Sequence, residues 1–201
     1  MAASTVSNLF YSHSERLIYR APELNDADKT FIQKQILNDP TCQTMSSGRL
    51  RRPVPQKNAE EFIKMFHEAL LGVLICLPAS QSDSSAEPIP IGHLSIFRTY
   101  PPETDHHRCA GLGISFAAGH RGKGYGGEVI NWALDWAFQH AGLHRVSLGA
   151  FSYNENALKL YRKLGFVEEG REREGIYHCR GWHDIVLLSM LEHEWEALRG
   201  E

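Results

Sequence analysis

Apolar residues alternate or cluster in short segments along the chain, and these segments predict strands separated by helices. The alternation at residues 16–20 is typical of a first strand, which Pro22 ends. Asn25 or Asp26 can cap a helix that runs to about Leu37. The same patterns predict further strands at residues 73–77, 91–99, 108–116, 145–151 and 185–190, and further helices at residues 60–71, 129–142, 154–165 and around 192–196.

The segments between these elements indicate one domain with an N-terminal extension. Residues 1–14 are predicted to be a flexible arm, and residues 15–201 to form a single domain, since a chain of 201 residues can bury a sizeable core. Residues 41–58, which hold several arginines and prolines, are predicted to be an ordered loop or lid. Residues 78–90, rich in Ser, Asp and Pro, are predicted to be an exposed hairpin loop.

A glycine-rich segment at residues 121–127 lies between an apolar strand and an amphipathic helix. Glycine has no side chain, so backbone N–H groups in such a loop can converge on an anion. The N-terminal end of the helix that follows adds roughly half an elementary positive charge. Strand, loop and helix together predict a binding site for a phosphate group of a ligand.

Three phosphate-binding patterns compete for this segment, and residue spacing separates them. A P-loop needs Ser or Thr directly after its lysine, whereas Lys123 is followed by Gly124. The dinucleotide pattern G-x-G-x-x-G is formally met, but the acid expected about 20 residues later is absent from the end of the next strand. The third pattern, R/Q-x-x-G-x-G/A, is met by Arg121, Gly124 and Gly126.

A second motif supports the third pattern. Residues 154–166 read N-E-N-A-L-K-L-Y-R-K-L-G-F, with an asparagine suited to the N-cap of a helix and a glycine suited to its C-terminal end. The two motifs resemble the acetyl-CoA loop and the N-x-x-A-x-x-x-Y-x-K-x-G-F element of the GNAT superfamily of N-acetyltransferases. Residues 181–190 are similar to the end of its ribosomal-protein-acetyltransferase (Rim-type) branch.

The resemblance is clear from about residue 90 to residue 193 and looser before that. It implies an α/β fold, with a central mixed, mostly antiparallel sheet that contains a parallel, splayed strand pair and is flanked by helices. It also implies an acyl-CoA-dependent N-acetyltransferase. Such an enzyme moves an acetyl group from acetyl-CoA to a primary amine in a ternary complex, without a metal ion.

The resemblance assigns roles to residues at matching positions. Tyr161 matches the tyrosine that protonates the thiolate of departing coenzyme A, which a phenol with a pKa of about 10 can do; its alternative role is that of a core tyrosine. The strand before the loop would hold the pantetheine arm and polarise the thioester carbonyl with a backbone N–H. Asn154 either contacts coenzyme A or only caps its helix. The expected coenzyme A contacts are Ile114, Ser115, Phe116, Arg121, Gly122, Lys123, Gly124, Tyr125, Gly126 and Asn154.

The general base is left open, because this chain departs from the family pattern. Many members carry a glutamate on the strand before the loop, in the region where this chain has Ala110 and Gly111. The alternatives are a water chain or one of the side chains of His93, Asp105, His106, His107 and Asp184. The missing carboxylate also keeps a second hypothesis open, a non-catalytic acyl-CoA-binding or regulatory domain.

Composition limits the partners. A formal net charge of −3 argues against a nucleic-acid-binding protein, which would usually be basic. No apolar run approaches the roughly 20 residues of a membrane span. The cysteines are scattered without a C-x-x-C pair, and no signal peptide is recognised, which predicts a cytoplasmic protein with reduced thiols. No histidine or cysteine group has the spacing of a metal site, so no metal is expected.

The acceptor is expected to be a small-molecule amine or a protein N-terminal amine. Its specificity should depend on residues 41–58, 99–108 and 172–183, where members of such a family differ. The basic run at residues 49–52 favours an acidic or neutral acceptor over a polyamine. Homodimerisation is common in such folds and stays open here.

Overall fold

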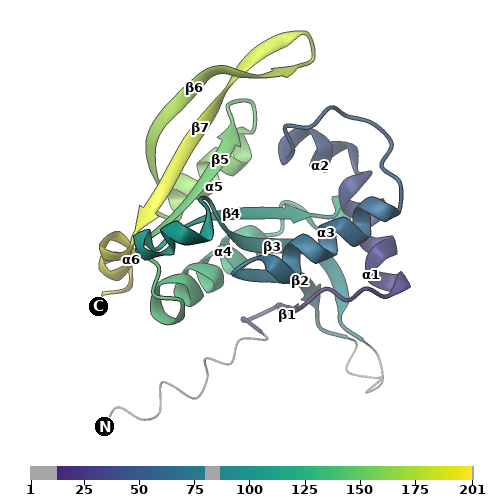
Figure 1. The fold of residues 1–201 in the computed structure, drawn as a ribbon, viewed down its shortest axis with the longest axis horizontal. Coiled ribbons are helices and arrows are strands. Elements are labelled where there is room, and N and C mark those ends of the chain that lie inside the picture. Colours follow the sequence, from purple (N-terminus) through teal and green to yellow (C-terminus); the bar gives the residue numbers. More distant parts are fainter. Residues whose placement is uncertain (1–12, 80–86, 201) are drawn as a thin grey trace.

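The computed structural model describes residues 13–79 and 87–200, which form a seven-stranded sheet flanked by helices (Figure 1). The strands lie in the order β1-β2-β3-β4-β5-β7-β6. β4 and β5 are parallel, and the other neighbouring pairs are antiparallel. The fold class predicted from the sequence is therefore confirmed.

The elements follow the predicted order closely. The strands are β1 (Ile18–Arg20), β2 (Leu71–Leu77), β3 (Ile89–Arg98), β4 (Cys109–Phe116), β5 (Arg145–Phe151), β6 (Val167–His178) and β7 (Gly181–Leu191). The helices are α1 (Asp26–Phe31), α2 (Pro40–Met45), α3 (Lys57–Glu68), α4 (Tyr125–Asp135), α5 (Glu155–Lys163) and α6 (Glu192–Arg199). α1 and α4 each continue into a π-helical segment, at Ile32–Leu37 and Trp136–His140.

β2 separates two apolar cores, because it is buried on both faces. Val73 and Ile75 belong to the larger core, which includes side chains of α4. Leu74 and Cys76 belong to the smaller core, together with Ile63 of α3. Successive side chains of a strand point to opposite faces, so the continuous apolar run of β2 serves both layers. α1 and α3 cover the near face in Figure 1.

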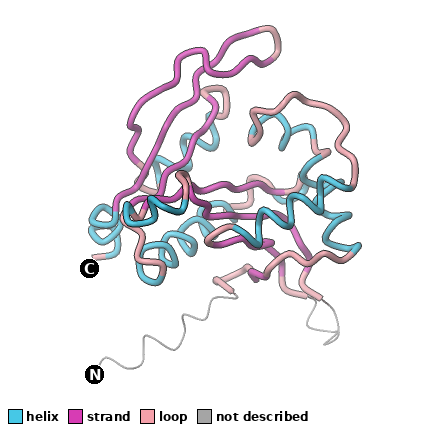
Figure 2. The backbone as a smooth tube through the Cα atoms, viewed as in Figure 1, coloured by secondary structure: helices cyan, strands magenta, loops and turns pink. Residues whose placement is uncertain are grey.

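The sheet opens between β4 and β5. Residues 109–111 of β4 pair with residues 145–147 of β5, and beyond them the two strands separate. β4 stays beside β3, whereas β5 continues with β7, so that the strands diverge in Figure 2. The C-terminal half of β4 therefore has an unpaired edge, whose backbone N–H and C=O groups can bind another extended chain. This separation is the splayed parallel pair expected from the sequence.

Two sequence predictions need correction. The helix predicted at residues 60–71 ends earlier, at Glu68, and Leu71 already belongs to β2. The loop predicted at residues 41–58 overlaps α2, for which Asp39 is the N-cap and Pro40 the first residue. Proline is well suited to the first helical position, so Pro40 both ends the preceding helix and begins the next.

Several predictions concern residues that are only partly described. Residues 1–12 of the predicted arm lie outside the described residues, and so do residues 80–86 of the predicted hairpin loop. Within the described part, His13 forms a β-bridge with Ile18. The division into an arm and one domain stays a prediction. Residues 172–183 are mostly strand, because β6 and β7 extend to a tight turn.

Candidate active site

The unpaired edge of β4 directs the backbone of Ile114 into the gap between β4 and β5. Ala117 donates its N–H to the carbonyl oxygen of Ile91 beside β3, at 2.8 Å. Alternate residues of an antiparallel strand bond to the same neighbour, so Ser115 and Gly113 also face β3. The N–H and C=O of Ile114 consequently point away from β3. An extended ligand arm can bind at this edge as an added strand.

The glycine loop begins one turn beyond this strand and leads into α4. Gly122 has φ +73° and Gly124, the N-cap of α4, has φ +82°, a left-handed conformation that favours glycine. The first backbone N–H groups of a helix have no intrahelical partner. A Cβ at Gly122 would meet no protein atom within 4 Å, so the space next to the loop is open to a ligand. This geometry suits a bound phosphate.

The side chain of Arg121 does not point toward this open space. Its Nε donates to the carbonyl of Phe116 at 2.8 Å, and its Nη2 forms a short ion pair with Asp39 and contacts Cys42 Sγ at 3.2 Å. Burial acts to raise the pKa of the Asp39 carboxyl, but the N–H of Cys42 and the guanidinium of Arg121 lower it more, and the net pKa lies below its ordinary value. Arg121 therefore ties the glycine loop to α2, and only its main chain faces the ligand space.

Arg16, which the sequence predictions did not single out, lies over the other side of the loop. Its Nη1 donates to the carbonyl of Lys123 at 3.3 Å, and its Nε pairs with Glu128 of α4 at 2.8 Å. The guanidinium also lies 4.9 Å from the ring centre of Tyr125. No local pattern marks Arg16, because its partners lie more than a hundred residues away in sequence.

α5 packs against the start of α4 and brings Tyr161 to the same region. A Cβ at Gly126 would lie 3.0 Å from Leu160 Cδ2, so the glycine allows the close approach of the two helices. The ring of Tyr161 packs against the larger core and lies edge-on to Phe166, with ring centres 5.9 Å apart. Burial raises the pKa of the Tyr161 phenol to about 12. The phenol therefore keeps its proton at neutral pH.

Asn154 is the N-cap of α5, as the sequence predicts. Its Oδ1 accepts from the N–H of Ala157 at 3.3 Å, and its Nδ2 donates to the carbonyl of Met45 at the end of α2, also at 3.3 Å. The neighbouring Tyr153 donates its hydroxyl to the carbonyl of Thr44 at 2.8 Å. α2 thus spans the gap between the two halves of the sheet. Whether Asn154 also contacts a ligand stays a prediction.

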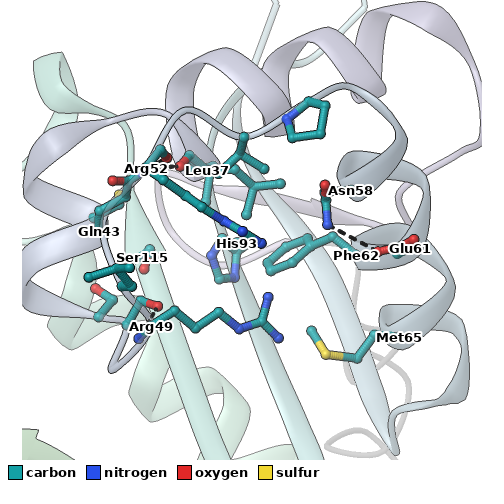
Figure 3. Close-up of a pocket in the computed structure, with 17 residues that line it drawn as sticks. Leu37, Gln43, Arg49, Arg52, Asn58, Glu61, Phe62, Met65, His93 and Ser115 are labelled. Atoms are coloured by element: carbon teal, nitrogen blue, oxygen red, sulfur yellow. Dashed lines mark hydrogen bonds between the residues drawn. The ribbon is translucent and has the colours of Figure 1, made fainter.

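A cavity of about 580 Å³ lies beneath α2 and the segment that follows it, against α3 and the sheet (Figure 3). Its volume is in the range of small-molecule binding sites. Ser115 of β4 lines it, on the opposite side of the strand from Ile114. The lining is Ile36, Leu37, Cys42, Gln43, Ser46, Ser47, Arg49, Leu50, Arg52, Val54, Pro55, Asn58, Glu61, Phe62, Met65, His93 and Ser115.

His93 lies at the inner wall of this cavity (Figure 3). Only 8% of its surface is exposed, and its Nδ1 has no hydrogen-bond partner among the described residues. The rings of Phe62 and Phe66 lie edge-on to the imidazole, with ring centres at 5.1 and 5.3 Å. Burial lowers the pKa of His93 to about 4, so the imidazole is neutral near pH 7. A buried polar atom without a partner is uncommon and indicates a missing ligand or water.

The other candidate bases lie elsewhere. Asp105 pairs with Arg98 in an exposed position, and the Asp184 carboxylate accepts the N–H of Glu174. The position of the expected strand glutamate is closed, because a Cβ at Gly111 would lie 2.6 Å from the ring of Phe97. Among the candidate bases proposed from the sequence, His93 is the one that lines the cavity.

The described residues contain neither a metal-ligand cluster nor a membrane-spanning helix. In the described ranges, no group of three or more His, Cys, Asp or Glu side chains is placed to hold a metal ion. The described helices are all too short or too polar to cross a membrane.

Comparison with known proteins identifies relatives of the chain. Residues 16–167 match a family model described as the acetyltransferase (GNAT) domain. The chain is 34% identical over 91 residues to YdaF of Bacillus subtilis, provisionally named a ribosomal N-acetyltransferase, covering 45% of this chain and 50% of that protein. It is 35% identical over 89 residues to the spermidine N(1)-acetyltransferase of Vibrio cholerae, covering 44% and 51%. The matches thus span about half the length of these relatives.

Solved structures share the fold over almost the whole chain. A GNAT-family acetyltransferase from Bacillus anthracis has a TM-score of 0.70 at 20% identity, covering 90% of this chain and 98% of that one. The spermidine N-acetyltransferase of Vibrio cholerae in complex with CoA and spermine has a TM-score of 0.72 at 24% identity, covering 90% and 99%. A dodecameric structure of that enzyme has a TM-score of 0.67 at 27% identity, covering 94% and 100%.

Proposed function

Because the chain belongs to the GNAT acetyltransferase family, we propose that it transfers an acetyl group from acetyl-CoA to a primary amine in a ternary complex. The observation that supports this most directly is the combination of two features, an unpaired strand edge at Ile114 and a glycine loop at the start of α4. The edge suits an extended pantetheine arm, and the loop suits a pyrophosphate. Together they would accommodate the pantetheine arm and the pyrophosphate of coenzyme A.

The main chain of the loop would hold the pyrophosphate. The loop borders open space at Gly122, where a Cβ would meet no protein atom within 4 Å, and the N-terminal end of α4 adds a favourable dipole. The Arg121 side chain would act indirectly, because its ion pair with Asp39 holds the loop against α2. The Arg16 guanidinium would fix the loop from the other side and place a positive charge near the phosphates.

The chemistry would take place in the gap beside Ile114. The thioester of acetyl-CoA supplies the acetyl group, and the Ile114 N–H would stabilise the negative charge that develops on the carbonyl oxygen. The amine nitrogen forms a bond to the carbonyl carbon, loses a proton, and the carbon–sulfur bond breaks. Tyr161, which is protonated at neutral pH, would donate a proton to the departing sulfur and regain one from solvent.

The amine must lose a proton during the reaction, and two candidate proton acceptors remain, His93 and a water chain. The neutral imidazole of His93 lies at the wall of the cavity, and no described residue bonds to its Nδ1. A water chain through the cavity is the alternative, because a histidine with a pKa of about 4 is a weak base. Whether His93 or a water chain accepts the proton, a bound amine could form the hydrogen bond that the His93 Nδ1 lacks among the described residues.

The test combines binding and turnover. Calorimetry should detect acetyl-CoA binding to the wild type and to Tyr161→Phe, but not to Gly124→Trp, whose side chain would begin 3.5 Å from the Arg16 guanidinium and disturb the contact that fixes the loop. Release of the coenzyme A thiol should then be followed with a panel of amines. Binding without turnover by any amine would favour the second hypothesis, a non-catalytic acyl-CoA-binding or regulatory domain.

The partners belong to the same proposal. Two acceptor classes are suggested by the names of relatives, polyamines by the spermidine acetyltransferases and protein amines by the ribosomal N-acetyltransferase. A dodecameric relative is consistent with self-association of this chain, which light scattering of the purified protein would measure. A cytoplasmic location and the absence of nucleic-acid or membrane partners remain predictions from the sequence.

A further inference from the structure

The charges that line the cavity are mainly positive. Arg49 and Arg52 contribute guanidinium groups, and Glu61 is the acidic residue of the lining. The Glu61 carboxylate already accepts a hydrogen bond from the side chain of Asn58, at 3.1 Å. A polycation would need several carboxylates at this place. The cavity instead has an excess of positive charge close to neutral polar and apolar groups.

The two guanidinium groups have no carboxylate partner among the described residues. Arg49 and Arg52 belong to the segment after α2, and Figure 3 shows both side chains extending over the cavity in front of its inner wall. By contrast, the adjacent Arg51 does not line the cavity and donates to Thr44 Oγ1 at 3.2 Å. Two arginine side chains at the same cavity are well suited to bind a carboxylate or a phosphate.

The remaining lining suits an amine with an apolar body. Leu50 is 88% exposed and Met65 is 48% exposed, and both border the cavity. Ligand-binding pockets are lined predominantly by apolar side chains with a few polar groups, and these residues fit that pattern. At the inner wall, the buried Nδ1 of His93 has no partner in the described part of the chain, and a substrate amine there would supply one. Ser115, the neighbour of His93 across the sheet, follows Ile114 directly.

These features lead to one substrate class. We propose that the acceptor is an amine that also carries a carboxylate or phosphate group, with its amine at His93 and its anionic group bound by Arg49 and Arg52. This inference rests on the proposed acetyl transfer and specifies its second substrate. A polyamine is disfavoured, because it would bring further positive charge next to two unpaired guanidinium groups.

The experiment compares matched amines that differ only in the anionic group. Calorimetry of the protein saturated with coenzyme A would measure binding of phenylalanine and phenethylamine, β-alanine and ethylamine, and phosphoethanolamine and ethanolamine. Initial rates of thiol release with acetyl-CoA would be measured for the same pairs and for spermidine. At least one anionic amine should bind on the order of tenfold more tightly than its partner. The pair that shows the preference identifies carboxylate or phosphate as the group bound.

Variants assign the preference to the cavity. Replacing both residues, Arg49→Gln and Arg52→Gln, should abolish the preference and leave the neutral amine unaffected. Arg51→Gln removes the same charge from the same segment outside the cavity and should keep the preference. His93→Leu should weaken both members of a pair, because both would lose the same polar contact at the inner wall.

The outcomes separate the inference from the proposed function. Equal binding within every pair, or tighter binding of spermidine than of every anionic amine, would overturn the inference while acetyl transfer still stands. Tight binding of an anionic amine with no thiol release would support the binding site formed by Arg49 and Arg52 but contradict acetyl transfer, and with it the role of that amine as acceptor. A preference that survives in the double variant would show that these arginines do not bind the anion.

Discussion

The proposed binding of the pyrophosphate by the glycine loop at residues 121–127 can be tested with a pair of glycine-to-alanine substitutions. The two substitutions should cost the same conformational free energy, but only one of them lies in the loop. Gly122 has φ +73° and Gly142 has φ +61°, and a Cβ at either position would meet no protein atom within 4 Å. Gly122 lies in the glycine loop before α4. Gly142 lies after the π-helical segment Trp136–His140 that continues α4, at the opposite end of this helix. The pair therefore separates backbone strain from loss of ligand binding.

The expected loss of stability is the same for both variants. A left-handed conformation costs an L-residue roughly 1–2 kcal/mol. For a domain of about 200 residues this corresponds to a decrease in Tm of roughly 2–8 °C, which thermal unfolding monitored by circular dichroism would measure. Because neither methyl group would collide with the protein, Gly122→Ala and Gly142→Ala should unfold at similar temperatures.

The affinity for acetyl-CoA should differ. In Gly122→Ala the methyl group would project into the phosphate space and disturb at least one charge-assisted hydrogen bond, worth about 1.5–3 kcal/mol. The Kd measured by calorimetry should rise roughly ten- to a hundredfold. Gly142→Ala should bind acetyl-CoA like the wild type. Acetylpantetheine, which has no pyrophosphate, should bind equally to all three proteins.

The result that would refute this reasoning is also specific. Equal affinity of Gly122→Ala and Gly142→Ala for acetyl-CoA, with similar melting temperatures, would place the pyrophosphate away from this loop. An equal loss of affinity for acetylpantetheine in Gly122→Ala would show a general distortion instead of a lost phosphate contact.

Three further predictions concern single side chains. Tyr161→Phe should lower kcat on the order of a hundredfold at unchanged KM for acetyl-CoA, and an unchanged kcat in initial-rate assays would argue against a proton donor. The lowered pKa of Asp39 implies stability that is present above its unfolded pKa of about 4 and is lost as the pH falls through the folded value. Urea unfolding of Asp39→Asn should therefore show a deficit of about 1–2 kcal/mol at neutral pH that disappears in acid, and a constant deficit would contradict the ion pair with Arg121. The pKa of His93, about 4 in the fold and 6.5 when unperturbed, predicts stability that decreases as the pH falls between these values; His93→Leu should lack this slope, and an identical slope would exclude His93 as its source.

Local features of the candidate active site could be predicted from the sequence because neighbouring residues decide them. Asn154 caps α5 through the N–H of Ala157, and Gly165 has the left-handed conformation, φ +97°, that suits the end of a helix. Gly122 and Gly124 adopt the left-handed conformations that a glycine-rich turn allows. Each of these outcomes depends on the intrinsic backbone preference of one residue and on contacts within a few positions.

The cavity could not be predicted in this way, because its parts come from distant segments. The register of β3 against β4 places His93 opposite Ser115, and α3 then buries the imidazole with Phe62 and Phe66. Sequence reasoning named His93 among several candidate bases, and only the packing of α3 on the sheet distinguishes it. The contact at Gly111 is likewise a product of strand pairing, because β3 brings the Phe97 ring to within 2.6 Å of the position that a Cβ would take there.

The sequence by itself determined the family, the order of the elements and the glycine loop, whose conformation follows from residues that are adjacent in the chain. The tertiary structure decided which charges remain available to a ligand. Arg121 is bound to Asp39, 82 residues away, whereas Arg49 and Arg52 extend over the cavity without an acidic partner in the described ranges. Whether a charged side chain forms an ion pair within the protein or remains available to a ligand depends on whether packing brings an opposite charge next to it. Helix positions and strand register across the whole domain decide this.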